Sequence, residues 1–233
     1  MAVEFISAIS EGNEIFGILH LPRNRLSPCV ICSHGLFSSK ESEKLVEIGE
    51  IFSAQGIAVL RYDHQGCGES GGDISMTNTT SRLQDLTAMI DLARQHPLLG
   101  NHLALLGSSM GSFISILKAA ADRAIRALAL WATPARLERK AEMTDEETSL
   151  RRAFYEDAAQ YDVVAAIKGL HNCLFLHGEY DETVPLAQAR ELYHGAKSPK
   201  QLEVFLGGDH RFTNSRDRHR AILLSLAWFQ KYL

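Results

Sequence analysis

The pentapeptide Gly107-Ser108-Ser109-Met110-Gly111 carries the clearest chemical signal in the sequence. It fits the pattern G-x-S-x-G, in which a sharp turn between a strand and a helix exposes a serine hydroxyl as a nucleophile. An apolar run, LALLG, leads into Ser109, and a helix-forming run, MGSFISILKAA, follows it at once. We therefore predict that Ser109 is a nucleophile and that its backbone is strained.

A second match to this pattern, Gly68-Glu69-Ser70-Gly71-Gly72, lacks the same context, because no helix is expected before about Thr80. It overlaps a G-x-G-x-x-G sequence that begins at Gly66. A dinucleotide site needs a helix that opens inside that motif and an acidic residue at the end of the next strand. Asp85 and Asp91 instead fall on a predicted helix, so we interpret the loop as structural and expect no cofactor.

A serine hydroxyl becomes a good nucleophile only when a base takes its proton, and that base should be a histidine held by a carboxylate. His210 lies in a short loop between the apolar run VFLGG and the last predicted helix, which suits a base that reaches back over the serine. His177 ends a predicted strand and His194 lies on a predicted helix. We therefore predict that His210 is the base.

The carboxylate that orients this histidine is expected between the serine and the histidine in chain order. Asp181 lies in the loop after the apolar run LFLHG, and it is our predicted acid. Glu179 and Asp209 remain alternatives. Asp209 is the weaker of the two because it adjoins His210, and a sequence neighbour rarely reaches the Nδ1 atom of the next residue.

Acyl transfer also needs hydrogen-bond donors for the oxyanion that forms on the attacked carbonyl. The N–H of Met110 is the first expected donor, since it opens the helix after the serine. The second should come from the loop that begins at His34-Gly35, where Leu36 is best placed and Phe37 is next.

Strand-like and helix-like stretches alternate around these residues, which favours an α/β fold with a mostly parallel sheet covered on both faces. About eight strands are expected, the first two forming an antiparallel hairpin around residues 10–12. The expected strands are 3–9, 13–21, 27–35, 57–63, 102–107, 125–134, 171–178 and 200–208. The expected helices follow at about 45–55, 83–93, 110–121, 185–196 and 219–233.

Composition excludes several classes of protein. The chain has 233 residues with a net charge of -4, contains no block of lysines or arginines, and has no apolar run long enough for a membrane span. It begins without the pattern of a signal peptide. Without a block of basic residues, no nucleic-acid partner is expected. Cys29 and Cys32 would lie ~10 Å apart on opposite faces of a strand, so we expect free thiols and a cytoplasmic location.

Residues 135–160 interrupt the alternation of strands and helices with a charged, helix-prone stretch. We predict a small lid-like helical insertion in one α/β domain that spans residues 1–233. Few of its side chains are apolar, so it should cover only a short acyl chain or a compact aromatic acyl group. Those side chains are Leu137, Met143, Leu150, Phe154 and Tyr155. Phe37, Phe154 and Tyr155 are the expected substrate contacts.

Taken together, these motifs resemble the α/β-hydrolase superfamily over nearly the whole chain, and within it the monoacylglycerol lipase, cinnamoyl (feruloyl) esterase and serine aminopeptidase-like group. The further landmarks are Arg61-Tyr62-Asp63 before the glycine loop, His177-Gly178 with Val184-Pro185, and Gly208-Asp209-His210. The resemblance implies a Ser109–Asp181–His210 triad with backbone donors at Leu36 and Met110. The insertion is shorter than the full lid of this group, so long-chain lipase activity is not expected.

The sequence therefore predicts a serine-dependent carboxylic-ester hydrolase that acts on small acyl esters. A thioesterase or an aminopeptidase with the same triad is an alternative, and Glu138, Glu142 or Glu146 could bind the amine of a peptide. A metal-dependent hydrolase would need ligands such as His34, His64 and His177, which form no recognisable ligand motif, so no metal is expected. A non-catalytic binding protein on the same fold is the remaining alternative.

Overall fold

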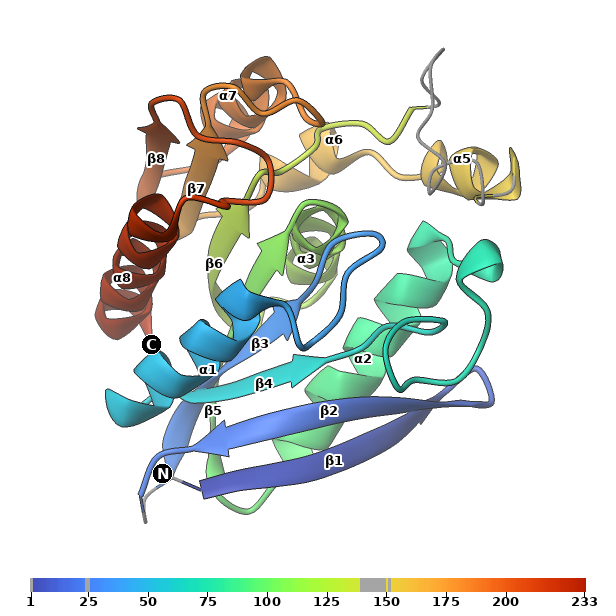
Figure 1. The fold of residues 1–233 in the computed structure, drawn as a ribbon, viewed down its shortest axis with the longest axis vertical. Coiled ribbons are helices and arrows are strands. Elements are labelled where there is room, and N and C mark those ends of the chain that lie inside the picture. Colours follow the sequence, from blue (N-terminus) through green and yellow to red (C-terminus); the bar gives the residue numbers. More distant parts are fainter. Residues whose placement is uncertain (1, 24–25, 139–149, 151) are drawn as a thin grey trace.

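A single sheet of eight strands organises the computed structural model, which describes residues 2–23, 26–138, 150 and 152–233 (Figure 1). The spatial order is β1-β2-β4-β3-β5-β6-β7-β8. The β1–β2 and β2–β4 pairs are antiparallel and the remaining pairs are parallel. The strands are β1 Ala2–Ser10, β2 Asn13–Leu21, β3 Ser27–Ser33, β4 Ala58–Tyr62, β5 Leu99–Ser108, β6 Ile125–Trp131, β7 Cys173–Gly178 and β8 Lys200–Phe205.

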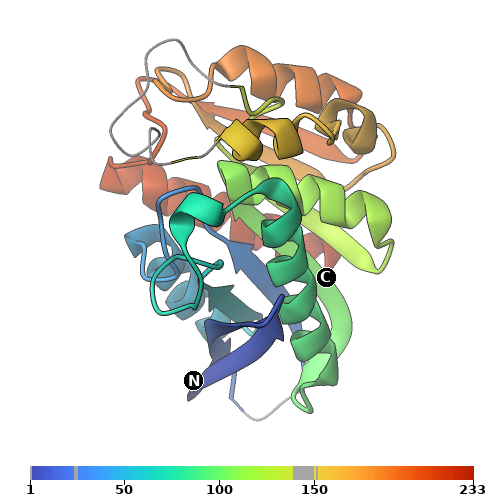
Figure 2. The ribbon, with the colours of Figure 1, turned by 90° about the vertical axis from the view of Figure 1, so that its right-hand side faces the viewer.

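Helices cover both faces of this sheet. They are α1 Glu43–Ala54, η1 Ile74–Met76, α2 Thr79–Gln95, α3 Met110–Ala121, α5 Arg152–Ala158, α6 Val163–Ile167, α7 Leu186–Gly195 and α8 Ser215–Tyr232. The apolar sides of α1 and α8 share one core, and those of α2, α3, α6 and α7 share the other. Figures 1 and 2 show α1 and α8 on one side of the sheet and α2 and α3 on the other.

Successive side chains of the central strands point to opposite faces of the sheet and contribute to the two cores in turn. On β3, Cys29 and Ile31 belong to the core under α2 and α3, whereas Val30 and Cys32 belong to the core under α1 and α8. Cys29 and Cys32 are therefore on opposite faces, as predicted, and both are buried free thiols. Strands buried on both faces need apolar residues at nearly every position, which explains the runs seen in the sequence.

Parallel strands bring the loops that follow them to one edge of the sheet. The register pairs Ser33 with Gly107, so the loop after β3 starts beside the end of β5. Gly178 pairs with Phe205 in the same way, so the loops after β7 and β8 are neighbours. The segments predicted to hold the nucleophile, the oxyanion donors, the acid and the base therefore meet at this edge.

The predicted strands and helices are all present, and their ends shift by a few residues. Strand β5 begins at Leu99 rather than at His102, and α8 begins four residues before His219. The sequence patterns did not indicate η1 or α6, which are too short to show a helical period. Residues 139–149 and 151 of the predicted insertion, including Met143, lie outside the described residues. No helix within the described ranges is long and apolar enough to cross a bilayer.

Candidate active site

The turn between β5 and α3 consists of Ser109 alone, because β5 ends at Ser108 and α3 begins at Met110. Ser109 has φ 53° and ψ -121°, a strained backbone that costs ~1–3 kcal/mol in a residue with a Cβ. A Cβ on Gly107 would lie 2.4 Å from the carbonyl carbon of Gly111, and one on Gly111 would lie 2.0 Å from a backbone oxygen of β3. The two glycines therefore make this turn sterically possible.

Asp181 and His210 form the closest carboxylate–imidazole pair at this edge. The Nδ1 atom of His210 lies 2.9 Å and 2.8 Å from the two carboxylate oxygens of Asp181. The Asp181 side chain is 0% exposed and that of His210 is 12% exposed. The backbone N–H groups of Thr183 and Val184 donate to Asp181 Oδ1 at 2.9 and 2.6 Å, which fixes the carboxylate. When Nδ1–H donates to the carboxylate, the neutral imidazole presents Nε2 as an acceptor.

The alternative acids have other partners. Glu179 accepts a hydrogen bond from the N–H of Gly207 at 3.0 Å. Asp209 accepts from the N–H of Thr213 at 2.9 Å and from the hydroxyl of the same residue. Neither carboxylate is hydrogen-bonded to His210, so the geometry favours Asp181 among the three candidates.

The two other candidate histidines do not line the cavity beside Ser109. His177 is fully buried, and its Nε2 lies 2.9 Å from the carbonyl oxygen of Val184 and 3.2 Å from Asp181 Oδ2. Burial lowers the pKa of His177, so it behaves as a neutral support for the acid. His194 lies on α7.

One cavity of about 840 Å³ brings the candidate residues together. It is lined by Ser109, His210 and Met110, by Leu36 and Phe37 from the loop after β3, and by Leu150, Phe154 and Tyr155 from the segment around α5. All predicted site residues except Asp181 thus line the cavity, and Asp181 lies behind His210. Residues 136–138 and 182–185 also line the cavity.

The loop after β3 is held close to the nucleophile. A Cβ on Gly35 would lie 3.3 Å from the Cβ of Ser109. The His34 ring contacts the Gly35 carbonyl oxygen at 2.7 Å through Nδ1 and accepts the N–H of His64 at 3.0 Å through Nε2. Burial lowers the pKa values of both histidines, so both rings are neutral. Among the described hydrogen bonds, none uses the N–H of Leu36 or Met110, which leaves both free for an oxyanion.

One apolar cluster borders the cavity beside α5. Met110, Leu150 and Phe154 form a buried cluster, against which Leu36, Phe37, Leu137 and Tyr155 pack. The rings of Phe154 and Tyr155 meet edge to face, with centroids 5.0 Å apart. The aromatic contacts predicted for a substrate therefore border the cavity directly beside the residue that follows the nucleophile.

Lys44 was not predicted from the sequence and also lines this cavity. Its ammonium donates a hydrogen bond to the Ser108 hydroxyl at 2.8 Å, one residue before the nucleophile. Desolvation on burial lowers the pKa of Lys44 to about 8. The only sequence signal was its place in the first turn of a helix, where a positive charge opposes the helix dipole.

Ser70 and the glycine loop make backbone contacts outside the cavity. Ser70 Oγ donates to the Asp63 carbonyl at 2.8 Å and accepts the N–H of Phe16 at 2.9 Å. No helix opens within the G-x-G-x-x-G sequence; η1 begins at Ile74, after it. The Gly66 and Gly68 residues have φ values of 73° and 52°, which only a glycine tolerates easily.

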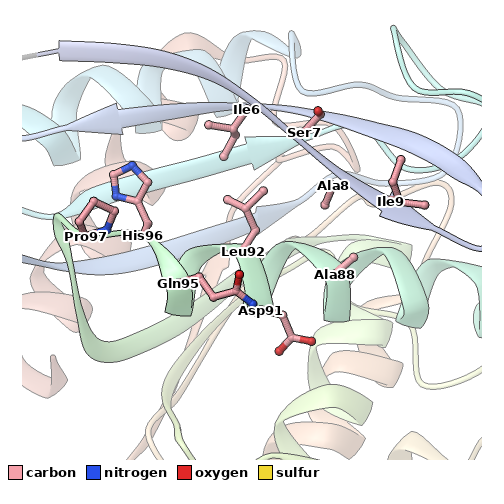
Figure 3. Close-up of a pocket in the computed structure, with 10 residues that line it drawn as sticks. All are labelled: Ile6, Ser7, Ala8, Ile9, Ala88, Asp91, Leu92, Gln95, His96 and Pro97. Carbon is pink, nitrogen blue, oxygen red and sulfur yellow. The ribbon is translucent and has the colours of Figure 1, made fainter.

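No other described cluster offers comparable chemistry. Within the described ranges, no group of three His, Cys, Asp or Glu side chains could hold a metal ion. A second depression, of about 640 Å³, lies between β1 and the end of α2 at the sheet edge (Figure 3). Its His96 is paired with Glu4 at 3.0 Å. Of the acids proposed to bind an amine, Glu138 lines the cavity, whereas Glu142 and Glu146 lie outside the described residues.

Comparison with known proteins identifies the family. Residues 25–156, more than half of the 233-residue chain, match the family described as serine aminopeptidase, S33. The chain belongs to this family. It is therefore a serine hydrolase of the α/β-hydrolase class, which confirms the resemblance seen in its motifs.

Curated relatives of this serine hydrolase include an esterase-type enzyme that acts on thioesters. Palmitoyl-protein thioesterase ABHD10, mitochondrial, from Mus musculus is 26% identical over 224 residues, which cover 84% of this chain and 73% of that protein. The uncharacterized protein YqkD from Bacillus subtilis (strain 168) is 24% identical over 237 residues, which cover 92% and 75%. The mouse protein's name places it in mitochondria, so a cytoplasmic location for this serine hydrolase stays a prediction.

Solved structures show the same fold. Est1E from Butyrivibrio proteoclasticus with bound ferulic acid gives a TM-score of 0.82 at 19% identity, over 97% of this chain and 99% of that chain. Mouse ABHD10 gives 0.78 at 21% identity, over 99% of each chain. At these identities the likeness establishes the α/β-hydrolase fold alone.

Proposed function

We propose that this serine hydrolase cleaves carboxylic esters through an acyl-enzyme on Ser109, with His210 as the base and Asp181 as the acid. The contact of 2.8 Å between Asp181 and the Nδ1 atom of His210 is the main observation in support, because it engages Nδ1 and leaves Nε2 as the proton acceptor. The strained turn at Ser109 supports the same assignment. Ser109 and His210 also line one cavity.

In the first half-reaction, Ser109 Oγ attacks the acyl carbonyl carbon and its proton passes to His210 Nε2. The carbonyl oxygen becomes an oxyanion, which the N–H groups of Leu36 and Met110 stabilise. When the oxyanion collapses, the bond to the leaving alcohol breaks. The alcohol oxygen takes the proton from His210, and the acyl group stays on Ser109.

In the second half-reaction, water attacks the acyl-enzyme while His210 removes one of its protons. Collapse of the second oxyanion releases the carboxylic acid and returns the proton to Ser109 Oγ. Asp181 remains ionised throughout, because it holds the imidazole in place and stabilises the imidazolium that forms twice in each turnover. The cycle needs no metal or organic cofactor.

We propose short-to-medium acyl chains or a compact aromatic acyl group as the substrates, with residues 135–160 as a partial cover on a single domain. Each buried CH₂ of an acyl chain contributes about 0.8 kcal/mol to binding. The apolar wall that can supply this consists mainly of the cluster around Met110, Leu150 and Phe154. Flat aromatic groups can pack against Phe154 and Tyr155.

Thioester hydrolysis is a second candidate for the same site. The observation that favours it is the similarity to a palmitoyl-protein thioesterase. The triad chemistry is unchanged, since a thiolate replaces the alkoxide as the leaving group. Comparing an acyl oxyester with the thioester of the same acyl group would rank the two activities.

The nucleophile is tested by labelling with a fluorophosphonate and by substitution. Ser109→Ala should abolish labelling and lower kcat by about 10³- to 10⁶-fold, because triad members act as a unit. Ser70→Ala is the control, since its hydroxyl is bonded to the backbone away from the cavity. Labelling that persists in Ser109→Ala, or that is lost in Ser70→Ala when the variant is folded, would contradict the assignment.

The acyl preference is tested with a series of p-nitrophenyl esters. We expect kcat/KM to peak at about C2–C8, because the gain per carbon stops where the apolar wall ends. A palmitoyl ester and a palmitoyl thioester belong in the same series, since the mouse relative is named for that acyl group. A steady rise out to C16 would show that the cavity continues as a long apolar tunnel and would refute the proposed acyl class.

A further inference from the structure

The wall of the cavity formed by the start of α1 is polar, unlike the wall around α5. Residues 42–44 line the cavity, and α1 begins at Glu43. Lys44 directs its ammonium at the nucleophile turn, where it donates to Ser108 Oγ at 2.8 Å. This single hydrogen bond leaves two of the three ammonium protons without an acceptor among the described residues.

Lys44 differs in its pairing from two other cations of the wall, Arg218 and Arg136. Arg218 is bonded to Glu43 and Glu47 at 2.7 and 2.9 Å. Arg136 makes a two-pronged pair with a glutamate on α7. Lys44 has no carboxylate within ion-pair distance in the ranges that the structure describes. The ammonium of this half-buried lysine therefore has no direct ion-pair partner among those residues.

The charged groups that face Lys44 show on which side of Ser109 it lies. Arg211 and Asp209 come from the loop that carries His210, and Arg218 comes from α8. The negative charge of Asp181, which lies behind His210, also acts on Lys44. Lys44 is therefore on the His210 side of the nucleophile. The leaving group lies on that side, because His210 must reach its oxygen to protonate it.

We propose that Lys44 is a specificity residue that binds an anionic group, such as a carboxylate, on the alcohol part of the ester. This inference rests on the proposed function and narrows its substrate class. The apolar cluster around Met110 receives the acyl group, and the leaving group extends along the start of α1. Lys44 then pairs with the anion while His210 gives its proton to the departing oxygen.

Two further features of the same wall fit an anion. The hydroxyl oxygen of Ser42 is buried and has no hydrogen-bond partner in the described part of the chain, so it can donate to a ligand. The positive end of the α1 dipole also lies at residues 42–44. Stability alone does not explain Lys44, because desolvation and the helix dipole both disfavour a cation at this place.

The first experiment compares two matched butyrate esters, of 3-hydroxybenzoate and of 3-hydroxybenzamide, which differ in the charge of the leaving group. For the unmodified protein, kcat/KM should favour the carboxylate. Lys44→Met should lower this ratio by about 10- to 100-fold, which is the size of a charge-assisted hydrogen bond. Lys44→Arg should keep most of it.

Lys118→Met is the matched control, because Lys118 is also half-buried and its ammonium also donates to a hydroxyl, that of Thr87 at 3.1 Å. Lys118 does not line the cavity, so the ratio should not change. A ratio unchanged in Lys44→Met, or an equal loss of activity toward both esters, would overturn the inference and leave Lys44 a structural role.

A second pair of esters tests whether the anion site faces the leaving group or the acyl group. In p-nitrophenyl hemiglutarate the charge is on the acyl group, and p-nitrophenyl butyrate is its uncharged counterpart. Their ratio should be insensitive to Lys44→Met. If Lys44→Met changes only this second ratio, the anion site belongs to the acyl side and the proposal is wrong. The pH profile is a second readout: the preference for the carboxylate leaving group should fall as pH rises through about 8, where Lys44 loses its proton.

Binding separates this inference from the proposed function. Calorimetry with Ser109→Ala should show tighter binding of 3-hydroxybenzoate than of 3-hydroxybenzamide, and Lys44→Met in that background should remove the difference. Lys44-dependent binding without ester cleavage by the unmodified protein would refute the proposed function but retain the anion site. Cleavage of both esters without any Lys44-dependent preference would refute the anion site alone.

Discussion

At the scale of single residues, several hydrogen bonds hold the carboxylate of Asp181 in place. Two backbone N–H groups donate to it, and His210 contacts both of its oxygens. This carboxylate can therefore hold only one orientation of the His210 ring. The proposed role of His210 as the base depends on that orientation, because Nε2 can accept the proton of Ser109 only when Nδ1 carries the other one.

Asp181→Asn should lower kcat by about 10³- to 10⁴-fold, because an amide stabilises the wrong tautomer of His210 and no imidazolium. Steady-state kinetics on a short acyl ester measure this. Asp209→Asn is the matched control: its carboxylate bonds to Thr213, and the change should alter kcat by less than about tenfold. A damaging Asp209→Asn with a mild Asp181→Asn would assign the acid to Asp209.

The candidate triad could be predicted because each member follows a recognisable strand. Ser109 is marked by its two flanking glycines, and His210 by the loop before the last helix. Asp181 was preferred over Glu179 without any knowledge of which carboxylate would reach the histidine. Lys44 was missed because a lysine beside apolar helix positions usually indicates a solvated face, and only the fold shows that this face borders the cavity.

At the scale of elements, periodicity predicts the strands and the long helices. The elements that it does not predict, η1 and α6, are too short to show a helical period. Helix α3 was placed at its observed bounds, since glycine and apolar residues define its start and its stripe. Helix α6 has five residues, Val163–Ile167, and follows an irregular segment, so no period was visible. Asp162, whose side chain caps α6, was its only local signal.

Helix α5 is tied to α2 by one carboxylate. Asp157 accepts the N–H of Thr80 at 3.1 Å and its hydroxyl at 2.5 Å, which caps the first turn of α2. The hydroxyl of Tyr161 lies 2.6 Å from the hydroxyl of Thr80. Because α5 also carries Phe154 and Tyr155, this contact positions the aromatic wall of the cavity.

Asp157→Ala should destabilise the protein by about 1 kcal/mol, as the loss of a helix cap does. It should also raise KM several-fold more for a hexanoyl ester than for an acetyl ester, because only the longer chain reaches the aromatic wall. Asp162→Ala is the control, since it removes the cap of α6, which does not line the cavity. Equal KM effects of the two changes would show that α5 does not position the acyl group.

At the scale of the whole molecule, the order of the strands could not be read from the sequence. Strand β4 lies between β2 and β3, although β3 precedes it in the chain. Alternating periods predict that the sheet is mostly parallel, but they do not say which strands are neighbours. That order brings His64, which follows β4, under the loop after β3, where its N–H is bonded to His34 at 3.0 Å.

A buried network of polar side chains lies beneath the candidate site. His64 Nδ1 is 3.1 Å from Asp85, and its Nε2 is 3.3 Å from the hydroxyl of Tyr62. That hydroxyl is 2.8 Å from the hydroxyl of Ser33. The network joins the segments after β3 and β4 to α2, so we expect its protonation state to affect the stability of the fold as well as the loop that carries Leu36, the proposed oxyanion donor.

Acid should weaken the fold through His64. Burial, followed by the nearby charge of Arg82, lowers the pKa of His64 from 6.5 to about 4. Between these pH values the unfolded chain binds a proton that the folded chain does not, so the free energy of unfolding falls as pH falls from 6.5 toward 4. One such group contributes about 1.4 kcal/mol per pH unit in that window and nothing above it.

Urea unfolding at pH 7.5, 6.5, 5.5 and 4.5 measures this slope. His64→Asn should reduce the dependence of the free energy of unfolding on pH between pH 6.5 and 4.5. The reduction should be up to about 1.4 kcal/mol per pH unit, which corresponds to one proton, whatever the substitution does to stability at neutral pH. His219→Asn is the control, because His219 is exposed on α8 and should leave the slope as it is. If the two variants give the same slope, His64 is protonated in the folded chain, and the buried network carries a positive charge beneath the oxyanion loop.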